Sequence, residues 1–159
     1  MNDNYNEELV AKFYTAFQKL DYRAMNNCYS EEIVFFDPVF ELLRGNQVRM
    51  MWKMLCISAK DLSIQFDDVI DRGDGYYTCN WIAQYTFSKT GSQVINRVKA
   101  HMKIENGKIT EHSDGFSLHK WTGQALGLPG KLFGWNRFFQ RRIKNNARAK
   151  LLAFIDEQS

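Results

Sequence analysis

The feature that most constrains the fold of this 159-residue chain is a change in hydrophobic periodicity at Leu62. Before that point, apolar residues recur at intervals of three and four, which is typical of amphipathic helices. After it, apolar and polar residues alternate, which is typical of strands with one buried face. In the clearest case, residues 93–105, the polar face carries Arg97, Lys99, His101, Lys103 and Glu105, and the apolar face carries Val98, Ala100, Met102 and Ile104.

Three helices are expected before Leu62. The first covers residues 7–20; the second begins at Asp21, its expected N-cap, and carries Met25 and Tyr29 on one side; the third follows residues 45–46. A short strand at residues 33–37, ended by a proline, separates the last two helices. Further strands are expected at about 62–70, 76–87, 93–105 and 108–118, the last two joined by an Asn-Gly hairpin turn. This order predicts an α+β fold in which the sheet curls around the helices.

Three motifs fall at the junctions of these elements. They read Lys19-Leu20-Asp21-Tyr22, Ile33-Val34-Phe35-Phe36-Asp37-Pro38-Val39, and Glu105-Asn106-Gly107-Lys108-Ile109 continuing to Asp114-Gly115-Phe116. Their order and spacing resemble the nuclear-transport-factor-2-like superfamily, which includes ketosteroid isomerases, polyketide cyclases and limonene-epoxide-type hydrolases. The likeness covers roughly residues 5–118. It implies a cone, in which a curved antiparallel sheet wraps around three N-terminal helices and leaves a pocket open at one end.

The resemblance implies two catalytic carboxylates. Asp37 matches the general base of ketosteroid isomerases, and Asp114 matches the last-strand aspartate of epoxide hydrolases and polyketide cyclases. Burial among aromatic rings would raise the pKa of such a carboxyl towards neutrality, and His112 could exchange protons with either group. The alternatives without chemistry are that Asp37 accepts backbone hydrogen bonds before Pro38, and that His112 and Asp114 form a hydrogen-bonded pair closing the pocket floor.

Two known mechanisms lack their residues in this chain. Steroid isomerisation uses a tyrosine hydroxyl and a protonated aspartic acid to stabilise the dienolate oxygen. By resemblance these positions fall on Phe13 and Ala100, while Tyr14 is expected to face elsewhere on its helix. The epoxide hydrolases also need an Arg and an Asp spaced by two, where this chain reads Trp81-Ile82-Ala83. We therefore expect neither mechanism in its known form.

An apolar pocket is expected inside the cone. Its lining would be Phe13, Phe17, Phe35, Trp52, Trp81, Tyr85, Val98, Ala100, Met102 and Phe116. The 12 Phe, 7 Tyr and 4 Trp suit either a cavity lined by rings or a solid aromatic core. The expected function is binding of a hydrophobic small molecule, with isomerase-, cyclase- or hydrolase-like acid/base chemistry at Asp37, Asp114 or both. The alternative is a non-catalytic module that binds a ligand or a partner protein.

No metal or cofactor is expected, because the three histidines do not converge and no phosphate-binding loop is present. The isolated Cys28, Cys56 and Cys79 indicate reduced thiols and a cytoplasmic protein. The N-terminus does not read as a signal peptide, and no apolar run reaches the roughly 20 residues of a membrane span. A homodimer is expected, because the outer face of the sheet often pairs in the superfamily.

Residues 119–159 are expected to form a helical extension of a domain covering residues 1–118. Residues 1–118 contain 13 Lys+Arg and 16 Asp+Glu. By contrast, residues 119–150 contain no acidic residue and eight basic ones: Lys120, Lys131, Arg137, Arg141, Arg142, Lys144, Arg148 and Lys150. Glycines and a proline at positions 127–134 predict a loop, followed by a helix that Asn136 caps and that ends near Asp156.

Three roles remain open for this helix: a lid on the cone, a dimer contact, or a contact with an anionic membrane or nucleic acid. Neither nucleic acid nor membrane is the expected partner. The large apolar residues Trp121, Phe133, Trp135, Phe139 and Ile143 are too many to leave in water. The extension is therefore expected to be ordered against its own domain or a dimer partner.

Overall fold

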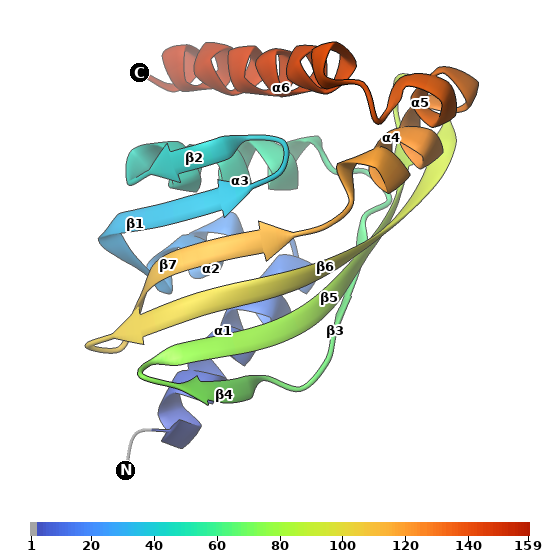
Figure 1. Ribbon diagram of the computed structural model, residues 1–159. Coiled ribbons are helices and arrows are strands. Elements are labelled where there is room, and N and C mark those ends of the chain that lie inside the picture. The colour runs from blue at the N-terminus through green and yellow to red at the C-terminus, as the bar shows by residue number, and fades with distance from the viewer. Residues whose placement is uncertain (1–2) are drawn as a thin grey trace.

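The computed structural model describes residues 3–159, which form an α+β fold as expected (Figure 1). The helices are α1 (Asp3–Gln18), α2 (Tyr22–Asn27), α3 (Asn46–Ser58), α4 (Leu118–Leu126), α5 (Leu128–Phe133) and α6 (Arg137–Gln158). The strands are β1 (Tyr29–Asp37), β2 (Glu41–Arg44), β3 (Ser63–Phe66), β4 (Ile70–Gly73), β5 (Tyr76–Phe87), β6 (Ser92–Glu105) and β7 (Lys108–Gly115).

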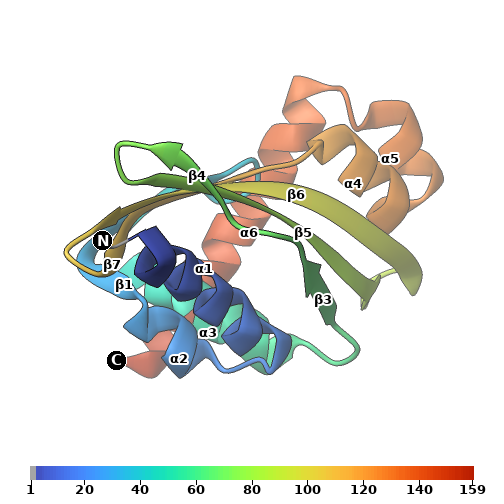
Figure 2. The same cartoon turned by 90° about the horizontal axis from the view of Figure 1, so that it is seen from below.

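All seven strands belong to one curved sheet with the order β2-β1-β7-β6-β5-β3, and β4 pairs with β5 beside β3. Every pairing is antiparallel except that of β1 with β7, which is parallel. Helices α1, α2 and α3 lie on the concave side of the sheet (Figures 1 and 2). The alternation in β6 points as predicted, with Val98, Ala100, Met102 and Ile104 buried against the helices.

Several of the expected elements differ in their bounds: α1 begins at Asp3, β1 begins at Tyr29 and β7 ends at Gly115, and β2 was not predicted. The strand expected at 62–70 is two strands, because β3 pairs with residues 81–84 of β5 and β4 pairs with residues 76–78. Between them Asp67 leaves the ladder, and its side chain accepts a hydrogen bond of 2.9 Å from the backbone of Asn80. Asp21 caps α2 as predicted, accepting from the backbone of Ala24 at 3.0 Å. Tyr29, however, begins β1 and does not extend that helix.

The segment expected as a glycine-rich loop, residues 127–134, forms the short helix α5, which follows directly on α4. Its glycines allow close approach: a side chain at Gly130 would collide with the carbonyl of Thr122, and one at Gly134 with the Thr122 hydroxyl. Helix α4 packs on β6 across the sheet from α1–α3, and α6 passes the β2 edge to pack on α3 (Figures 1 and 2). Asn136 caps α6 as predicted. None of the helices in residues 3–159 is long and apolar enough to cross a lipid bilayer.

Candidate functional site

Strands β1 and β7 bring the three candidate catalytic residues together inside the cone. Their parallel register sets Phe35 beside His112 and Phe36 beside Ser113. Continued by one residue, the register places Asp37 level with Asp114. Because side chains alternate along a strand, Asp37, His112 and Asp114 all face the concave side, where all three are buried. The sequence-based prediction that both carboxylates point inward agrees with this placement.

Five buried side chains form a continuous hydrogen-bonded series, which we call the inner polar chain: Trp52, Tyr29, His112, Asp114 and Trp81. Trp52 Nε1 donates to the Tyr29 hydroxyl at 2.9 Å, and that hydroxyl lies 2.7 Å from His112 Nδ1. His112 Nε2 lies 2.9 Å from Asp114 Oδ1, which also accepts from Trp81 Nε1 at 3.3 Å. The paired arrangement of His112 and Asp114, one of the alternatives left open, is therefore present.

Both ends of the inner polar chain are tryptophan N–H groups, which can only donate. The Tyr29 oxygen therefore accepts from Trp52, and Asp114 Oδ1 accepts from Trp81. Between these ends, both ring nitrogens of His112 lie within hydrogen-bond distance of a partner, Nδ1 of the Tyr29 hydroxyl and Nε2 of Asp114 Oδ1. These contacts hold the His112 ring and the Asp114 carboxylate in place.

Asp37 ends β1 and turns the chain into β2. Its Oδ1 accepts hydrogen bonds from the backbone amides of Val39 at 2.8 Å and Phe40 at 2.6 Å, as the structural alternative predicted. Burial raises the pKa of Asp37 to about 6, with a smaller upward contribution from Asp114, while the amide of Phe40 and the charge of His112 oppose the shift. Oδ2 receives no hydrogen bond from residues 3–159. Asp37 therefore has a free carboxylate oxygen and a proton affinity suited to neutral pH.

Aromatic rings occupy most of the space inside the cone. The Phe13 ring lies 5.2 Å from Tyr29, 5.8 Å from Trp52 and 5.5 Å from His112, measured between ring centroids. Of the residues expected to line a pocket, those that are buried are Phe13, Phe17, Phe35, Trp52, Trp81, Val98, Ala100 and Met102. Tyr85 and Phe116 are only partly buried, and the hydroxyl of Tyr85 accepts a hydrogen bond from Trp121 of α4 at 2.7 Å. These side chains pack as a ring-rich core, which was one of the two interpretations of the composition.

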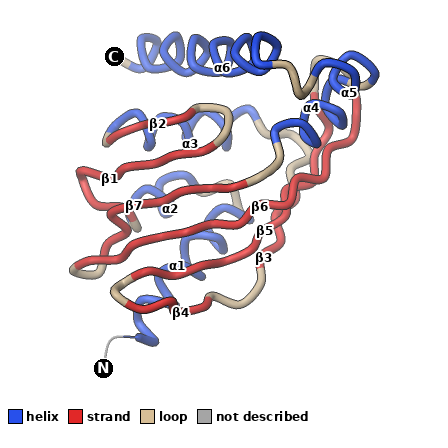
Figure 3. Tube along the Cα trace, in the orientation of Figure 1, coloured by secondary structure: helices blue, strands red, loops and turns tan. Residues whose placement is uncertain are grey.

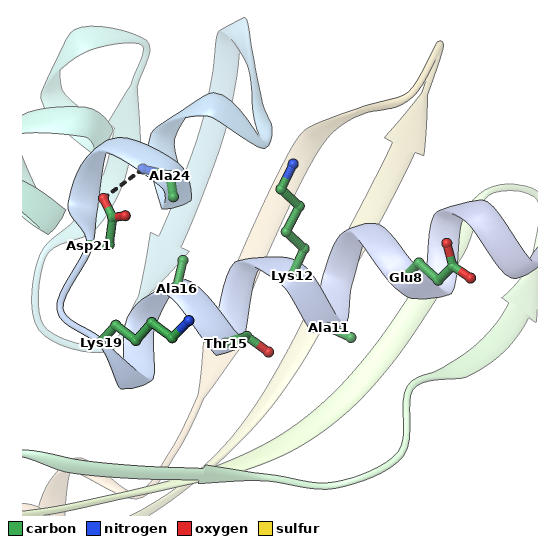
Figure 4. Close-up of a pocket in the computed structure, with 8 residues that line it drawn as sticks. All are labelled: Glu8, Ala11, Lys12, Thr15, Ala16, Lys19, Asp21 and Ala24. Carbon is green, nitrogen blue, oxygen red and sulfur yellow. Dashed lines mark hydrogen bonds between the residues drawn. The ribbon is translucent and has the colours of Figure 1, made fainter.

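Two surface hollows lie outside the cone. One, of about 340 Å³, lies along α1 and the start of α2 and is lined by Glu8, Ala11, Lys12, Thr15, Ala16, Lys19, Asp21 and Ala24 (Figure 4). The other, of about 330 Å³, lies against β1, β7 and β6 and includes Phe36, Tyr76, His101 and Lys103. The first contains none of the candidate catalytic groups, so it is distinct from the inner site.

Sequence reasoning missed two tyrosines of the site. Tyr29 was assigned to a helix, although it links Trp52 to His112. Tyr14 was expected to face elsewhere, yet it is fully buried, with its ring 5.9 Å from that of Trp81, and its hydroxyl has no hydrogen-bond partner among residues 3–159. Burial, reinforced by the nearby Asp114, raises the pKa of Tyr14 well above its ordinary value. The available signal was the spacing of Val10 and Tyr14, which share a helix face at four residues.

The three cysteines are free and buried. Burial raises the pKa of each of them, to about 11 for Cys56 and about 12 for Cys79, which leaves their thiols protonated at neutral pH. Within residues 3–159, no three His, Cys, Asp or Glu side chains are grouped so that they could hold a metal ion.

Comparison with protein families matches residues 10–112 to the SnoaL-like domain. No curated protein matches the chain. Among solved structures, it resembles a protein from Catenulispora acidiphila with a ketosteroid isomerase-like fold, at 14% identity and a TM-score of 0.67, covering 78% of this chain and 95% of that one. It also resembles an epoxide hydrolase from M. tuberculosis, at 14% identity and a TM-score of 0.64, covering 82% of this chain and 94% of that one. A third similar structure is a protein from Xanthomonas campestris pv. campestris, provisionally named a polyketide cyclase. Its identity is 17% and its TM-score 0.65, and the match covers 78% of this chain and 98% of that one.

Proposed function

The chain belongs to the family of SnoaL-like domains, and we propose that it binds a hydrophobic small molecule and moves a proton on it. The single observation that carries this proposal is the pair of carboxylates, Asp37 and Asp114, on neighbouring strands inside an aromatic interior. Two buried carboxylates at one level are costly for stability alone, since burial and mutual repulsion both disfavour their ionised forms. Such an arrangement is typical of sites that transfer protons.

Asp37 is proposed as the general base. With a pKa of about 6, it is ionised at neutral pH and remains basic enough to remove a proton, because burial has raised that pKa. The proton would pass from a carbon next to a ligand carbonyl to Asp37 Oδ2, while the electron pair moves onto the carbonyl oxygen. The hydroxyl of Tyr14, to which no residue of the described part of the chain bonds, would donate a hydrogen bond to a ligand oxygen.

Access to this site is expected beside Asp37. Its exposed fraction of 9% exceeds the 4% of Asp114 and the 1% of His112. The β1–β2 turn next to Asp37 is held by α6, where Arg148 Nη1 donates to the carbonyl of Phe40 at 3.0 Å. This contact supports the interpretation of α6 as a lid, and a ligand would have to shift side chains of the ring-rich core to enter.

The proposal is tested with a hydrophobic cyclic ketone, α-tetralone, incubated with the protein in D₂O. Exchange of the protons next to the carbonyl is followed by NMR. The wild type should accelerate this exchange, with a rate that rises with pH through about 6 as Asp37 loses its proton. Asp37→Asn should lower the acceleration about 100-fold or more, as expected for loss of a general base.

Glu31→Gln is the matched control, because Glu31 is an exposed carboxylate on the same strand. It should retain the wild-type rate. Equal acceleration by the wild type and Asp37→Asn would show that Asp37 is not the base. The absence of both acceleration and ligand-induced thermal stabilisation would favour the non-catalytic alternative.

A second candidate function is association through the outer face of the sheet. Phe36 and Tyr76 remain 48% and 40% exposed there and lie against the second hollow. We propose that this face forms the contact of a homodimer. Light scattering should then give twice the chain mass of 18.7 kDa, and Phe36→Ser should reduce it to that of one chain. A single-chain mass for the wild type at all concentrations would exclude this interface.

A further inference from the structure

The corner where α5 meets α6 leaves large apolar side chains in water. We call this surface the apolar corner; it consists of Leu128, Leu132, Phe133, Trp135 and Phe138, with exposed fractions of 67%, 54%, 52%, 67% and 87%. The sequence predicts that its own domain or a dimer partner covers these residues, and within one chain Phe133 and Trp135 remain exposed. Soluble single chains rarely gather so many large exposed apolar residues without a partner for them.

The apolar corner has a defined shape. Leu128 and Leu132 lie one turn apart on α5, and Trp135 Nε1 donates to the carbonyl of Leu132 at 2.8 Å. The ring of Phe133 lies 6.4 Å from that of Phe139 in the first turn of α6. Figures 1 and 2 show α5 and the start of α6 at a corner of the molecule, away from α1–α3. The exposed rings therefore lie on an ordered turn at the periphery of the molecule.

Positive charge surrounds the apolar corner. Lys131 lies three residues after Leu128 on α5, and Arg142 lies four residues after Phe138 on α6, so each is adjacent to an exposed apolar residue. Lys131, Arg137 and Arg142 are exposed, and no carboxylate of residues 3–159 forms a salt bridge with them. Since residues 119–150 contain no acidic residue, nothing in this segment neutralises the charge.

We propose that the apolar corner docks the protein on an anionic phospholipid surface. The basic side chains would contact lipid headgroups, and Trp135, Phe138 and the leucines would enter the boundary with the acyl chains. Tryptophan is favoured at that depth, because its ring is apolar and its N–H is polar. This proposal departs from the sequence-based expectation of no membrane partner.

Two other partners, a second copy of the chain and a nucleic acid, fit the apolar corner less well than an anionic bilayer does. A symmetric contact with a second copy would bring the same basic surface against itself, with no acidic residue in either segment to offset the repulsion. A nucleic acid would satisfy the arginines and could stack on Trp135, but it would leave Leu128 and Leu132 in water. An anionic bilayer accommodates both the charge and the aliphatic side chains.

Vesicle flotation tests the proposal on the full chain. Vesicles of equimolar phosphatidylcholine and phosphatidylglycerol should bind the wild type, with affinity falling as salt rises, and pure phosphatidylcholine vesicles should bind at least about tenfold more weakly. The double variant Trp135→Ser/Phe138→Ser should lose at least about tenfold in affinity for the anionic vesicles, because it removes apolar insertion. Arg137→Glu/Arg142→Glu should lose a similar factor or more through charge reversal.

Matched controls distinguish binding through the apolar corner from non-specific binding of vesicles by other exposed apolar or basic residues. Ile57→Ser removes an apolar side chain on α3 that is also more than half exposed, and Arg97→Glu/Lys99→Glu reverses two exposed charges on β6. Both controls should bind vesicles like the wild type. Absence of binding to anionic vesicles at low salt would overturn the proposal, as would equal binding by the corner variants. Tight RNA binding without vesicle binding, or a dimer abolished by Phe138→Ser, would instead identify another occupant and also overturn it.

Discussion

At the scale of single residues, two buried tyrosines make opposite contributions to the interior. The hydroxyl of Tyr29 bonds Trp52 and His112, whereas that of Tyr14 has no partner within the part of the chain that the structure describes. A buried hydroxyl without a partner loses its hydrogen bonds to water and gains nothing in return. Tyr29 thus supports the inner polar chain, while Tyr14 carries a cost that is explained if a ligand supplies the missing acceptor.

Tyr29→Phe should lower the free energy of unfolding by roughly 1–3 kcal/mol, because it leaves His112 Nδ1 and Trp52 Nε1 buried without a partner. Tyr14→Phe is the matched control, since it removes a hydroxyl that bonds to nothing and keeps the ring; it should be neutral or stabilising. Urea unfolding monitored by circular dichroism measures both variants. Equal destabilisation by the two changes would contradict the assigned hydrogen bonds.

Asp37 should make stability depend on pH in an identifiable window. Its pKa is raised in the folded state, from 3.8 to about 6, so the folded protein holds the proton more tightly than the unfolded chain. This contribution is fully present below pH 3.8 and is lost as the pH rises through about 6. Its maximum size is roughly 3 kcal/mol.

Asp37→Asn removes this dependence while keeping the shape of the side chain. Relative to the wild type, the variant should therefore gain stability as the pH rises from 4 to 7, after which the difference should level off. Urea unfolding of both proteins across this range gives the difference curve. A curve that slopes the other way would show that the carboxylate is better stabilised inside the protein than in water.

At the scale of elements, α6 is apolar in two different places. Near its C-terminal end Leu151 is buried in the core, with Ala147, Phe154 and Ile155 packed beside it, and the helix contacts α3. At its N-terminal end Phe138 is almost fully exposed. One helix therefore anchors to the cone through one end and presents the apolar corner with the other.

Leu151→Ala should destabilise the protein by roughly 2–5 kcal/mol, because the side chain is 1% exposed and its removal leaves a cavity. The neighbouring Leu152 is 48% exposed, so Leu152→Ala should cost less than about 1 kcal/mol. Thermal unfolding at one pH compares the two. Similar losses would mean that α6 does not pack on α3 as the structure has it.

In the whole molecule, helices cover both faces and one edge of the curved sheet. Figure 2 shows α1–α3 on one side of the strands and α4 and α5 on the other, and Figure 3 shows α6 running along the β2 edge. Residues 119–159 cover apolar surface of the remainder: Ala125 and Leu151 are both buried. We propose that residues 1–118 form the domain and that the extension completes its core.

Deleting residues 119–159 should therefore yield an unstable or aggregating protein, since it uncovers part of the core and an edge of the sheet. Removing only residues 157–159, which are exposed, should leave the melting temperature unchanged. Solubility and thermal unfolding measure both deletions. A soluble truncated protein with the wild-type melting temperature would show that the extension is an independent arm.

Features that depend on local periodicity and turn chemistry could be predicted from the sequence. The alternation of residues 93–105 fixed which face of β6 is buried, and the caps at Asp21 and Asn136 fixed where two helices begin. The motifs around Asp37 and Asp114 indicated the family and the inward direction of both carboxylates. These features follow from neighbouring residues, because a strand or helix repeats its geometry over a few positions.

Features that depend on contacts between distant segments could not be predicted from the sequence and were found only in the folded structure. The parallel pairing of β1 with β7 sets Asp37 level with Asp114, across more than seventy residues of sequence. Side-chain volumes, which no spacing reveals, decided that rings fill the cone. The close contact of Gly130 with Thr122 and the exposure of Trp135 and Phe138 likewise depend on how the helices pack. Burial is a property of the packed molecule, so hydrophobicity in the sequence could not tell which apolar residues would find a partner.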